Sequence, residues 1–123
     1  MGIKLFVDDM RSAPEGWHRS QTITEAIAAL ANLDVEAISL DHDIIFEPAG
    51  SAIFSNENFT AVAYYVAAMP KDIRPKRAYI HTANPAGAIR IKGILDSAGI
   101  PSERVFPDMN YKKQLLNFEN EAQ

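Results

Sequence analysis

Three short apolar segments constrain the fold more than any other feature of the sequence, because each of them ends abruptly in polar residues. Residues 3–7, 37–40 and 78–80 have the pattern of strands that are buried on both faces of a parallel sheet. Each segment is followed at once by acidic, histidine or amide side chains, in the sequences Asp8-Asp9, Asp41-His42-Asp43 and His81-Thr82-Ala83-Asn84. Ligands bind beyond the carboxyl ends of strands in open sheets of this kind. If the three strands are neighbours, we expect these polar ends to form one site.

Length and composition predict a single globular domain that spans residues 1–123. The chain is 47% hydrophobic and 23% charged, as soluble proteins are, and it has no cysteine for a disulfide or a thiolate metal site. Its formal net charge of −4 argues against binding of extended duplex nucleic acid, which requires a basic stripe. No run approaches the ~18 apolar residues of a membrane span, and the amino terminus lacks a signal-peptide pattern. We therefore expect a cytoplasmic protein with no membrane partner.

The segments between the apolar runs predict helices. Thr22 and Glu25 have the spacing of a capping box, and Asn58 is a favourable N-cap. Asn84 precedes a helix that Gly99 should end. The weaker signals are a second strand at residues 17–19, a fifth strand at residues 104–106, a long loop at residues 44–57 and a last helix after Asp108.

Strands that alternate with helices imply parallel βαβ units with right-handed crossovers. We therefore expect an α/β fold of three layers, flavodoxin-like, with a five-stranded parallel sheet in the order 2-1-3-4-5. One early helix should be missing, because residues 10–16 are few and are interrupted by Pro14 and Gly16.

The acidic residues predict a metal site. Asp8, Asp9 and Asp41 supply hard oxygen ligands at neighbouring strand ends, and Asp43 is a further candidate ligand. Such ligands suit Mg²⁺ or Mn²⁺, and a bound cation relieves the repulsion between crowded carboxylates. A lone pair of acids more often caps a turn. Three acids at two strand ends favour a shared site instead.

His42 and His81 are candidates for proton transfer, because imidazole titrates near neutral pH. A single histidine is more often packed in the core or hydrogen-bonded, and His18 is interpreted in that way. Two histidines at neighbouring strand ends favour a role as acid and base on a phosphoester, with Asp41 completing the catalytic set. Adjacent strand residues point to opposite faces, so His42 and Asp41 can both face the site only if the strand has already ended.

The helix that follows Asn84 is a candidate phosphate site. Its open amides at residues 85–87 would point into the crevice, Gly87 keeps the backbone approachable, and Arg90 lies one turn further along. Thr82 can donate to a phosphoryl oxygen, and Arg11 can act as a phosphate clamp. An ordinary capped helix accounts for Asn84 equally well, and Arg11 is equally explained as a solvated surface charge.

The positions of these residues resemble the two-component receiver domain. In that family an acidic pair, here Asp8-Asp9, binds Mg²⁺, and an aspartate that ends the third strand, here Asp41, is phosphorylated. A hydroxyl, here Thr82, and a fifth-strand lysine contact the phosphoryl group in that family. The lysine is absent from this chain, which reads Val105-Phe106-Pro107 at that point. The missing lysine makes phosphotransfer an unfavourable interpretation.

A narrower resemblance is to the cyclic-phosphate processing receiver domain. Three motifs carry it in order, namely D-D-x-R-x-x-P at residues 8–14, S-L-D-H-D at residues 39–43 and H-[ST]-x-N-P at residues 81–85. The match extends to at least Arg90 and implies a receiver-like fold that acts as a metal-dependent enzyme on cyclic phosphates, as at RNA ends. The chain departs from the family after the second motif, where Ile44-Ile45-Phe46 replaces a glycine-bearing loop.

Three functions are compatible with these features. The first is a Mg²⁺- or Mn²⁺-dependent phosphoesterase whose partner is a phosphate-bearing small molecule or an RNA end. The second is a non-enzymatic receiver relative that signals by binding a partner, and the third is a module that binds a cyclic nucleotide without cleaving it. Turnover of a cyclic phosphate separates the first from the other two.

Overall fold

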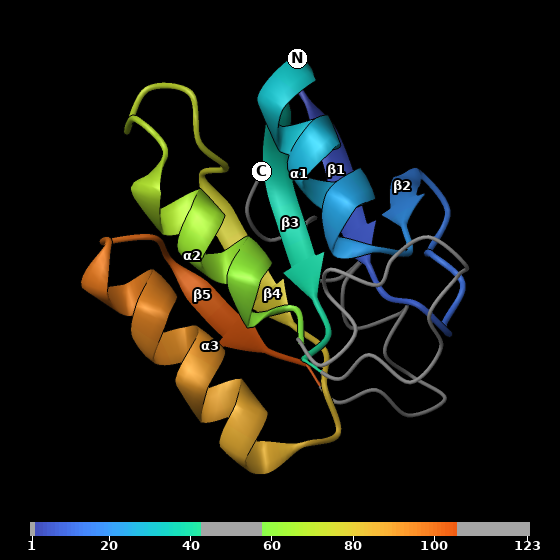
Figure 1. The fold of residues 1–123 in the computed structure, drawn as a ribbon, viewed down its shortest axis with the longest axis vertical. Coiled ribbons are helices and arrows are strands. Elements are labelled where there is room, and N and C mark those ends of the chain that lie inside the picture. Colours follow the sequence, from blue (N-terminus) through green and yellow to red (C-terminus); the bar gives the residue numbers. More distant parts are fainter. Residues whose placement is uncertain (1, 43–57, 106–123) are drawn as a thin grey trace.

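The computed structural model describes residues 2–42 and 58–105 of the chain, and these form one parallel sheet with helices packed against it (Figure 1). The elements in chain order are β1 (Ile3–Val7), β2 (Trp17–Ser20), α1 (Ile23–Asn32), β3 (Val35–Leu40), α2 (Thr60–Ala68), β4 (Arg77–Ile80), α3 (Pro85–Ser97) and β5 (Ser102–Arg104). The strand order is β2-β1-β3-β4-β5, and every neighbouring pair is parallel. The predicted fold class and strand order are confirmed. None of the helices in the described ranges is long and apolar enough to cross a membrane.

Alternation along the strands divides the buried side chains between the two faces of the sheet. Leu5 and Val7 of β1 belong to the main core, which also contains buried residues of α1, α2 and α3. Phe6, between them, packs on the opposite face with Trp17 and Tyr79. Because side chains on a strand point to alternate faces, this division follows directly from the sequence of β1. The three described helices therefore all cover one face, and the helix predicted after Asp108, which would supply the third layer, lies outside the described residues.

The helix boundaries show which local signals are reliable. Thr22 Oγ1 accepts a hydrogen bond from Glu25 N (3.0 Å), as predicted for the N-cap of α1. Gly99, just after α3, has a φ of +75°, the left-handed conformation expected of a residue that ends a helix. The predicted N-cap of α2 was one residue early, because Phe59 is the N-cap and Asn58 instead accepts a hydrogen bond from Thr60 N (2.8 Å).

The last strand was predicted too far along the chain. Residues 104–106 were expected because they contain apolar Val105, whereas β5 comprises residues 102–104. An edge strand is defined by pairing with its one neighbour, and here Ser102 lies opposite Ala78 and Arg104 opposite Ile80. Hydrophobicity alone does not fix that register.

The connection between β1 and β2 contains no helix, as predicted. It comprises residues 8–16, and its first turn is closed by Asp8 Oδ1, which accepts hydrogen bonds from Met10 N and Arg11 N (2.8 Å each). Gly16 has a φ of +86°, a left-handed conformation that glycine adopts without strain, and it returns the chain to β2. The acidic residues after β1 therefore lie on a tight turn at the edge of the sheet.

Candidate functional site

The register of the sheet aligns the ends of three strands. Val7 lies opposite Leu40, and Leu40 lies opposite Ile80, so β1, β3 and β4 end in one row. The next residue of each strand continues the ladder, since Asp41 N donates to Val7 O (3.0 Å) and His81 N donates to Leu40 O (2.9 Å). The structure therefore brings the polar residues after these strands together, as the sequence predicted.

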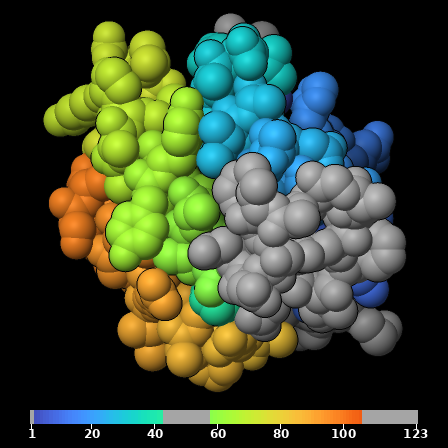
Figure 2. Space-filling view, viewed as in Figure 1, coloured from blue at the N-terminus to red at the C-terminus, as the bar shows by residue number. Residues whose placement is uncertain are grey.

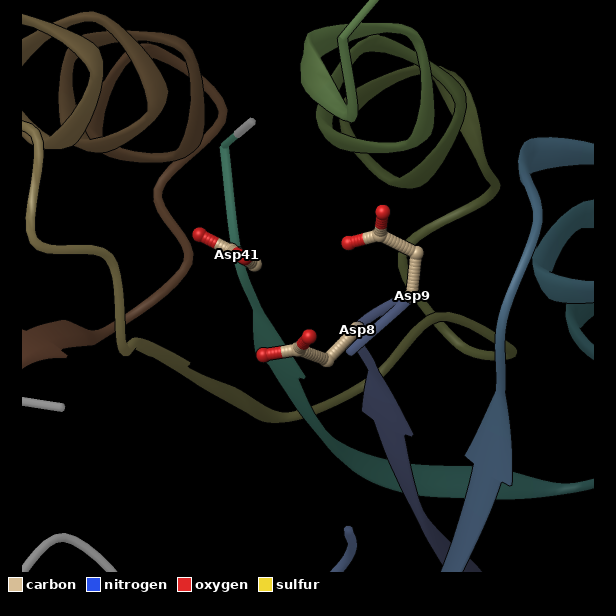
Figure 3. Close-up of side chains that lie close together, drawn as sticks. All are labelled: Asp8, Asp9 and Asp41. Atoms are coloured by element: carbon tan, nitrogen blue, oxygen red, sulfur yellow. The ribbon is translucent and has the colours of Figure 1, made fainter. Parts of the chain in front are cut away.

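Three carboxyl groups form the centre of the site. Asp8, Asp9 and Asp41 are each at most 4% exposed, and one oxygen from each lies within 4.8 Å of the others. Figure 3 shows the three side chains gathered in one space between the end of β1 and the end of β3. Hard oxygen ligands in this number are the donors that Mg²⁺ and Mn²⁺ prefer, and such ions complete their coordination with water. The residues present therefore fit a divalent cation.

Arg11 partly neutralises this cluster. Its Nη1 lies 3.1 Å from Asp8 Oδ2 and 3.2 Å from Asp41 Oδ2, so one guanidinium bridges carboxylates from two strands. The sequence predicted a phosphate clamp at this position. In the structure the guanidinium pairs with two of the three acids, and the binding of a phosphate by Arg11 stays a prediction.

The two bridged acids differ in acidity because their partners differ. Burial by itself would raise the pKa of Asp8, but the hydrogen bond from His81 and those from the amides of Arg11 and Met10 lower it to about 2. Burial raises the pKa of Asp41, and the nearby Asp8 carboxylate raises it further. A cation bound between these acids would favour ionised Asp41.

His81 lies beneath the acids and not at the surface. Its ring is fully buried and stacks on Phe6, with ring centroids 4.2 Å apart and planes 6° from parallel. Nε2 lies 3.0 Å from Asp8 Oδ2, and Nδ1 lies 2.6 Å from Ser39 Oγ. The ionised carboxylate can only accept, so Nε2 donates to it, and Nδ1 is hydrogen-bonded to the Ser39 hydroxyl. With both nitrogens engaged and the ring buried, His81 is placed to orient Asp8 and not to contact a substrate.

Ser39 begins the second family motif, but the sequence alone assigned it no role in the site. It is fully buried in β3, and it holds the ring nitrogen of His81 that faces away from Asp8. A polar residue in an otherwise apolar buried strand requires a hydrogen-bond partner. That requirement was a signal available in the sequence.

His42 is the more accessible histidine. Strand β3 ends at Leu40, which meets the condition under which Asp41 and His42 can both face the site. The side chain is partly exposed, and the backbone is held on both sides, because His42 N donates to Asp41 Oδ1 (2.7 Å) and His42 O accepts from Phe59 N (2.9 Å). The residue thus joins the acidic cluster to the start of α2.

The turn into α3 uses most of the groups that were expected to bind phosphate. Thr82 is fully buried, and its Oγ1 accepts a hydrogen bond from Asn84 N (3.1 Å). Asn84 Oδ1 in turn accepts from Gly87 N (3.1 Å). Pro85 has no N–H, so of the amides expected to be open at residues 85–87 only that of Ala86 is not engaged within the described chain. Thr82, Asn84 and Gly87 therefore shape this turn.

Two predicted site residues remain, Arg90 and Asp43. Arg90 is exposed, makes no hydrogen bond or ion pair with the described residues, and lines a shallow groove with Tyr64 and Gly93. Figure 2 shows α2 and α3 adjoining at the surface on this face. Asp43, the fourth candidate ligand, lies outside the described residues.

Comparison with known proteins identifies the family. No curated protein matches the chain. The structure is similar to that of a CheY-like response regulator receiver domain protein from Methanospirillum hungatei JF-1, with a TM-score of 0.62 and 13% sequence identity over 98% of this chain and 93% of that chain. At this identity the likeness shows the fold, which is that of a receiver domain. The family model described as the cyclic-phosphate processing receiver domain matches residues 3–97, which include the strand ends and turns described above, and the chain therefore belongs to that family.

Proposed function

We propose that this protein is a divalent-metal-dependent phosphoesterase that opens cyclic phosphates at RNA ends or on nucleotides. The observation that carries the proposal is the cluster of Asp8, Asp9 and Asp41, three buried carboxyl groups at the ends of adjacent strands. Partly exposed His42 follows the cluster directly, and the family is described by the processing of cyclic phosphates.

The three aspartates would hold Mg²⁺ or Mn²⁺, and Asp43 remains a predicted further ligand. Such an ion offsets the charge of the phosphate and lowers the pKa of a bound water. His81 contributes indirectly, because its hydrogen bond to Asp8 Oδ2 fixes the direction of that carboxylate. A ligand that is held in place before the ion arrives loses less conformational freedom on binding.

Hydrolysis of a cyclic phosphate requires one proton to move. Water attacks phosphorus, one of the two ring P–O ester bonds breaks, and the proton lost by the water is returned to the departing sugar oxygen, which leaves a monoester. His42 is the group we assign to this proton, because it is the partly exposed imidazole next to the acids. Arg11 would bind the phosphate once its pairing with Asp8 and Asp41 is relieved, and Arg90 would contribute longer-range attraction.

The test is direct. The protein is incubated with nucleoside 2′,3′-cyclic phosphates and with RNA that ends in one, with Mg²⁺, Mn²⁺ or EDTA, and ³¹P NMR follows conversion to the monoester. We expect turnover that requires the ion and that falls by about 100-fold in His42→Ala, the usual contribution of a general acid or base. Undiminished turnover in EDTA would refute the metal requirement. Tight binding without product would identify a nucleotide-binding module instead.

A further inference from the structure

Gly87 in the first turn of α3 lies against the imidazole of His42. A Cβ atom built on Gly87 would lie 2.7 Å from His42 Nδ1 and 2.8 Å from Cδ2, and closer still to Cγ. Contacts this short do not occur with a real side chain, so the ring packs directly on the helix backbone. The imidazole occupies the space that any other residue at position 87 would fill.

Backbone conformation does not explain the glycine. Within the described ranges, only Gly16 and Gly99 have a positive φ, so position 87 has a conformation that other residues adopt. Glycine is also a poor helix former compared with alanine, so local helix stability favours replacement. Space for His42 is the remaining reason for glycine at this position.

Three elements together fix the place of His42. Its amide donates to Asp41 Oδ1 at the end of β3, and its carbonyl accepts from Phe59 N at the start of α2. Its ring rests on Gly87 at the start of α3. Cγ is the ring atom attached to the side-chain stem, so relief of a clash at Cγ requires the whole ring to rotate away.

We propose that Gly87 is a positioning residue, which seats the imidazole of His42 on the first turn of α3 beside Asp41. The absence of a side chain at Gly87 therefore makes room for the protein's own His42 ring and not for a phosphate. The effect on catalysis rests on the proposed function, in which His42 moves the proton. The positioning of the His42 ring by Gly87 does not depend on the proposed function, and we call this positioning the seat.

The structure offers a matched control on the same helix. A Cβ atom at Gly93 would meet nothing within 4 Å, so Gly93→Ala makes the same chemical change in α3 without the clash. The chain has three histidines, and His42→Ala assigns the ring signals of His42 in a ¹H–¹³C NMR spectrum recorded in EDTA. We expect Gly87→Ala to shift the His42 signals and leave those of exposed His18 in place, and Gly93→Ala to shift neither. Unchanged His42 signals in Gly87→Ala would overturn the proposal.

A second variant keeps the test valid if Gly87→Ala folds poorly. Removing the ring removes the clash, so the double variant Gly87→Ala, His42→Ala should melt at a higher temperature than Gly87→Ala alone. A double variant that melts no higher than Gly87→Ala would contradict the seat.

Kinetics then separate the seat from the proposed function. If both hold, Gly87→Ala lowers kcat on a 2′,3′-cyclic phosphate about as much as His42→Ala, leaves KM nearly unchanged, and adds nothing in the double variant. Independent, multiplying losses would show that Gly87 does not act through His42. A shifted His42 signal with undiminished turnover would uphold the seat and refute the role of His42 in the reaction.

Discussion

His81 Nε2 lies 3.0 Å from Asp8 Oδ2, although the two residues are 73 positions apart in the chain and β3 lies between their strands in the sheet. Ser39 of β3 binds the other ring nitrogen of His81, and Arg11 joins Asp8 to Asp41. A continuous set of hydrogen bonds and ion pairs therefore links the ends of three strands. Two of the proposed ligands, Asp8 and Asp41, are held by this network before any ion binds.

The first prediction concerns the two nitrogens of His81. In His81→Gln the side-chain amide lies near the former Nε2 and can still donate to Asp8, whereas in His81→Asn it lies near the former Nδ1 and can bond only Ser39. Both variants should lose about 2–4 kcal/mol of stability, because the ring stacked on Phe6 is lost from a buried site. Calorimetric titration with Mn²⁺ should show tighter binding by the glutamine variant. Equal Mn²⁺ affinities of the two variants would show that the hydrogen bond from His81 does not orient Asp8 for ion binding.

The second prediction concerns Arg11 as the counter-ion of the acids. Arg11→Gln leaves two buried carboxylates facing each other, so the ion-free protein should lose about 1–2 kcal/mol, a value discounted for the partial exposure of the arginine. The same change removes a competitor for the carboxylates, so Mg²⁺ should bind more tightly and restore more stability than in the wild type.

Arg90→Gln is the control for Arg11→Gln, because Arg90 is exposed and pairs with no described residue. Its melting temperature and its response to Mg²⁺ should match those of the wild type, with a change in stability below about 0.5 kcal/mol. Chemical denaturation with and without the ion measures both variants. Weaker ion binding by Arg11→Gln would show that Arg11 supports the ion and does not compete with it.

The third prediction concerns ion binding by the folded protein. Mg²⁺ at 100 times its dissociation constant should stabilise the protein by about 2.7 kcal/mol, and EDTA should reverse the effect. Asp9→Asn should reduce that response strongly, because it removes one of the three clustered carboxylates. Asp96→Asn, which alters an exposed carboxylate paired with Lys92 on α3, should respond as the wild type does. Differential scanning calorimetry compares the three proteins, and equal responses would place the ion elsewhere.

The fourth prediction concerns acid pH. The pKa of Asp8 is about 2 in the folded protein against an ordinary value of 3.8, so ionised Asp8 favours the folded state above about pH 4. That contribution, about 2 kcal/mol, is lost as the pH falls toward 2. The pKa of Asp41 is raised, so its protonation on acidification favours the folded state and partly offsets the loss.

The two acids should therefore have opposite effects on acid stability. In EDTA, Asp8→Asn should lose less stability than the wild type between pH 5 and about pH 2.5, and Asp41→Asn should lose more. Urea unfolding across this range measures both slopes. Parallel pH profiles for all three proteins would contradict the assignment of the low pKa to Asp8.

The location of the acidic cluster could be predicted because it depends on local patterns. The apolar run Ile3–Val7 and the run before Asp41 each mark a buried parallel strand, and the residue that ends such a run lies at the carboxyl edge of the sheet. Val7, Leu40 and Ile80 lie opposite one another in the sheet, so the acids that follow Val7 and Leu40 lie close together. Strand order and the points at which the apolar runs end were therefore enough to predict where the cluster lies.

The roles of the histidines could not be read in the same way. His81 was expected to move a proton, but side chains on a strand point to alternate faces of the sheet. Ile80 faces the helices, so His81, the next residue, faces the opposite side and packs on Phe6. The contact between His42 and Gly87 joins the end of one strand to the start of a distant helix, and no local pattern encodes it. The hydrogen bonds around Asn84 agree with the capped-helix alternative, and phosphate binding at this turn stays a prediction.

The helix-free connection between β1 and β2 has a practical consequence. Residues 8–16 carry two of the clustered carboxylates, Asp8 and Asp9, and Arg11, which pairs with Asp8, and parallel strands anchor the segment at both ends. We expect an exchange of this one segment to change the local charge, and the selectivity of the proposed ion site, while the helices and their core stay in place. Residues 8–16 are therefore a suitable segment to exchange when the ligand preference of the site is to be changed.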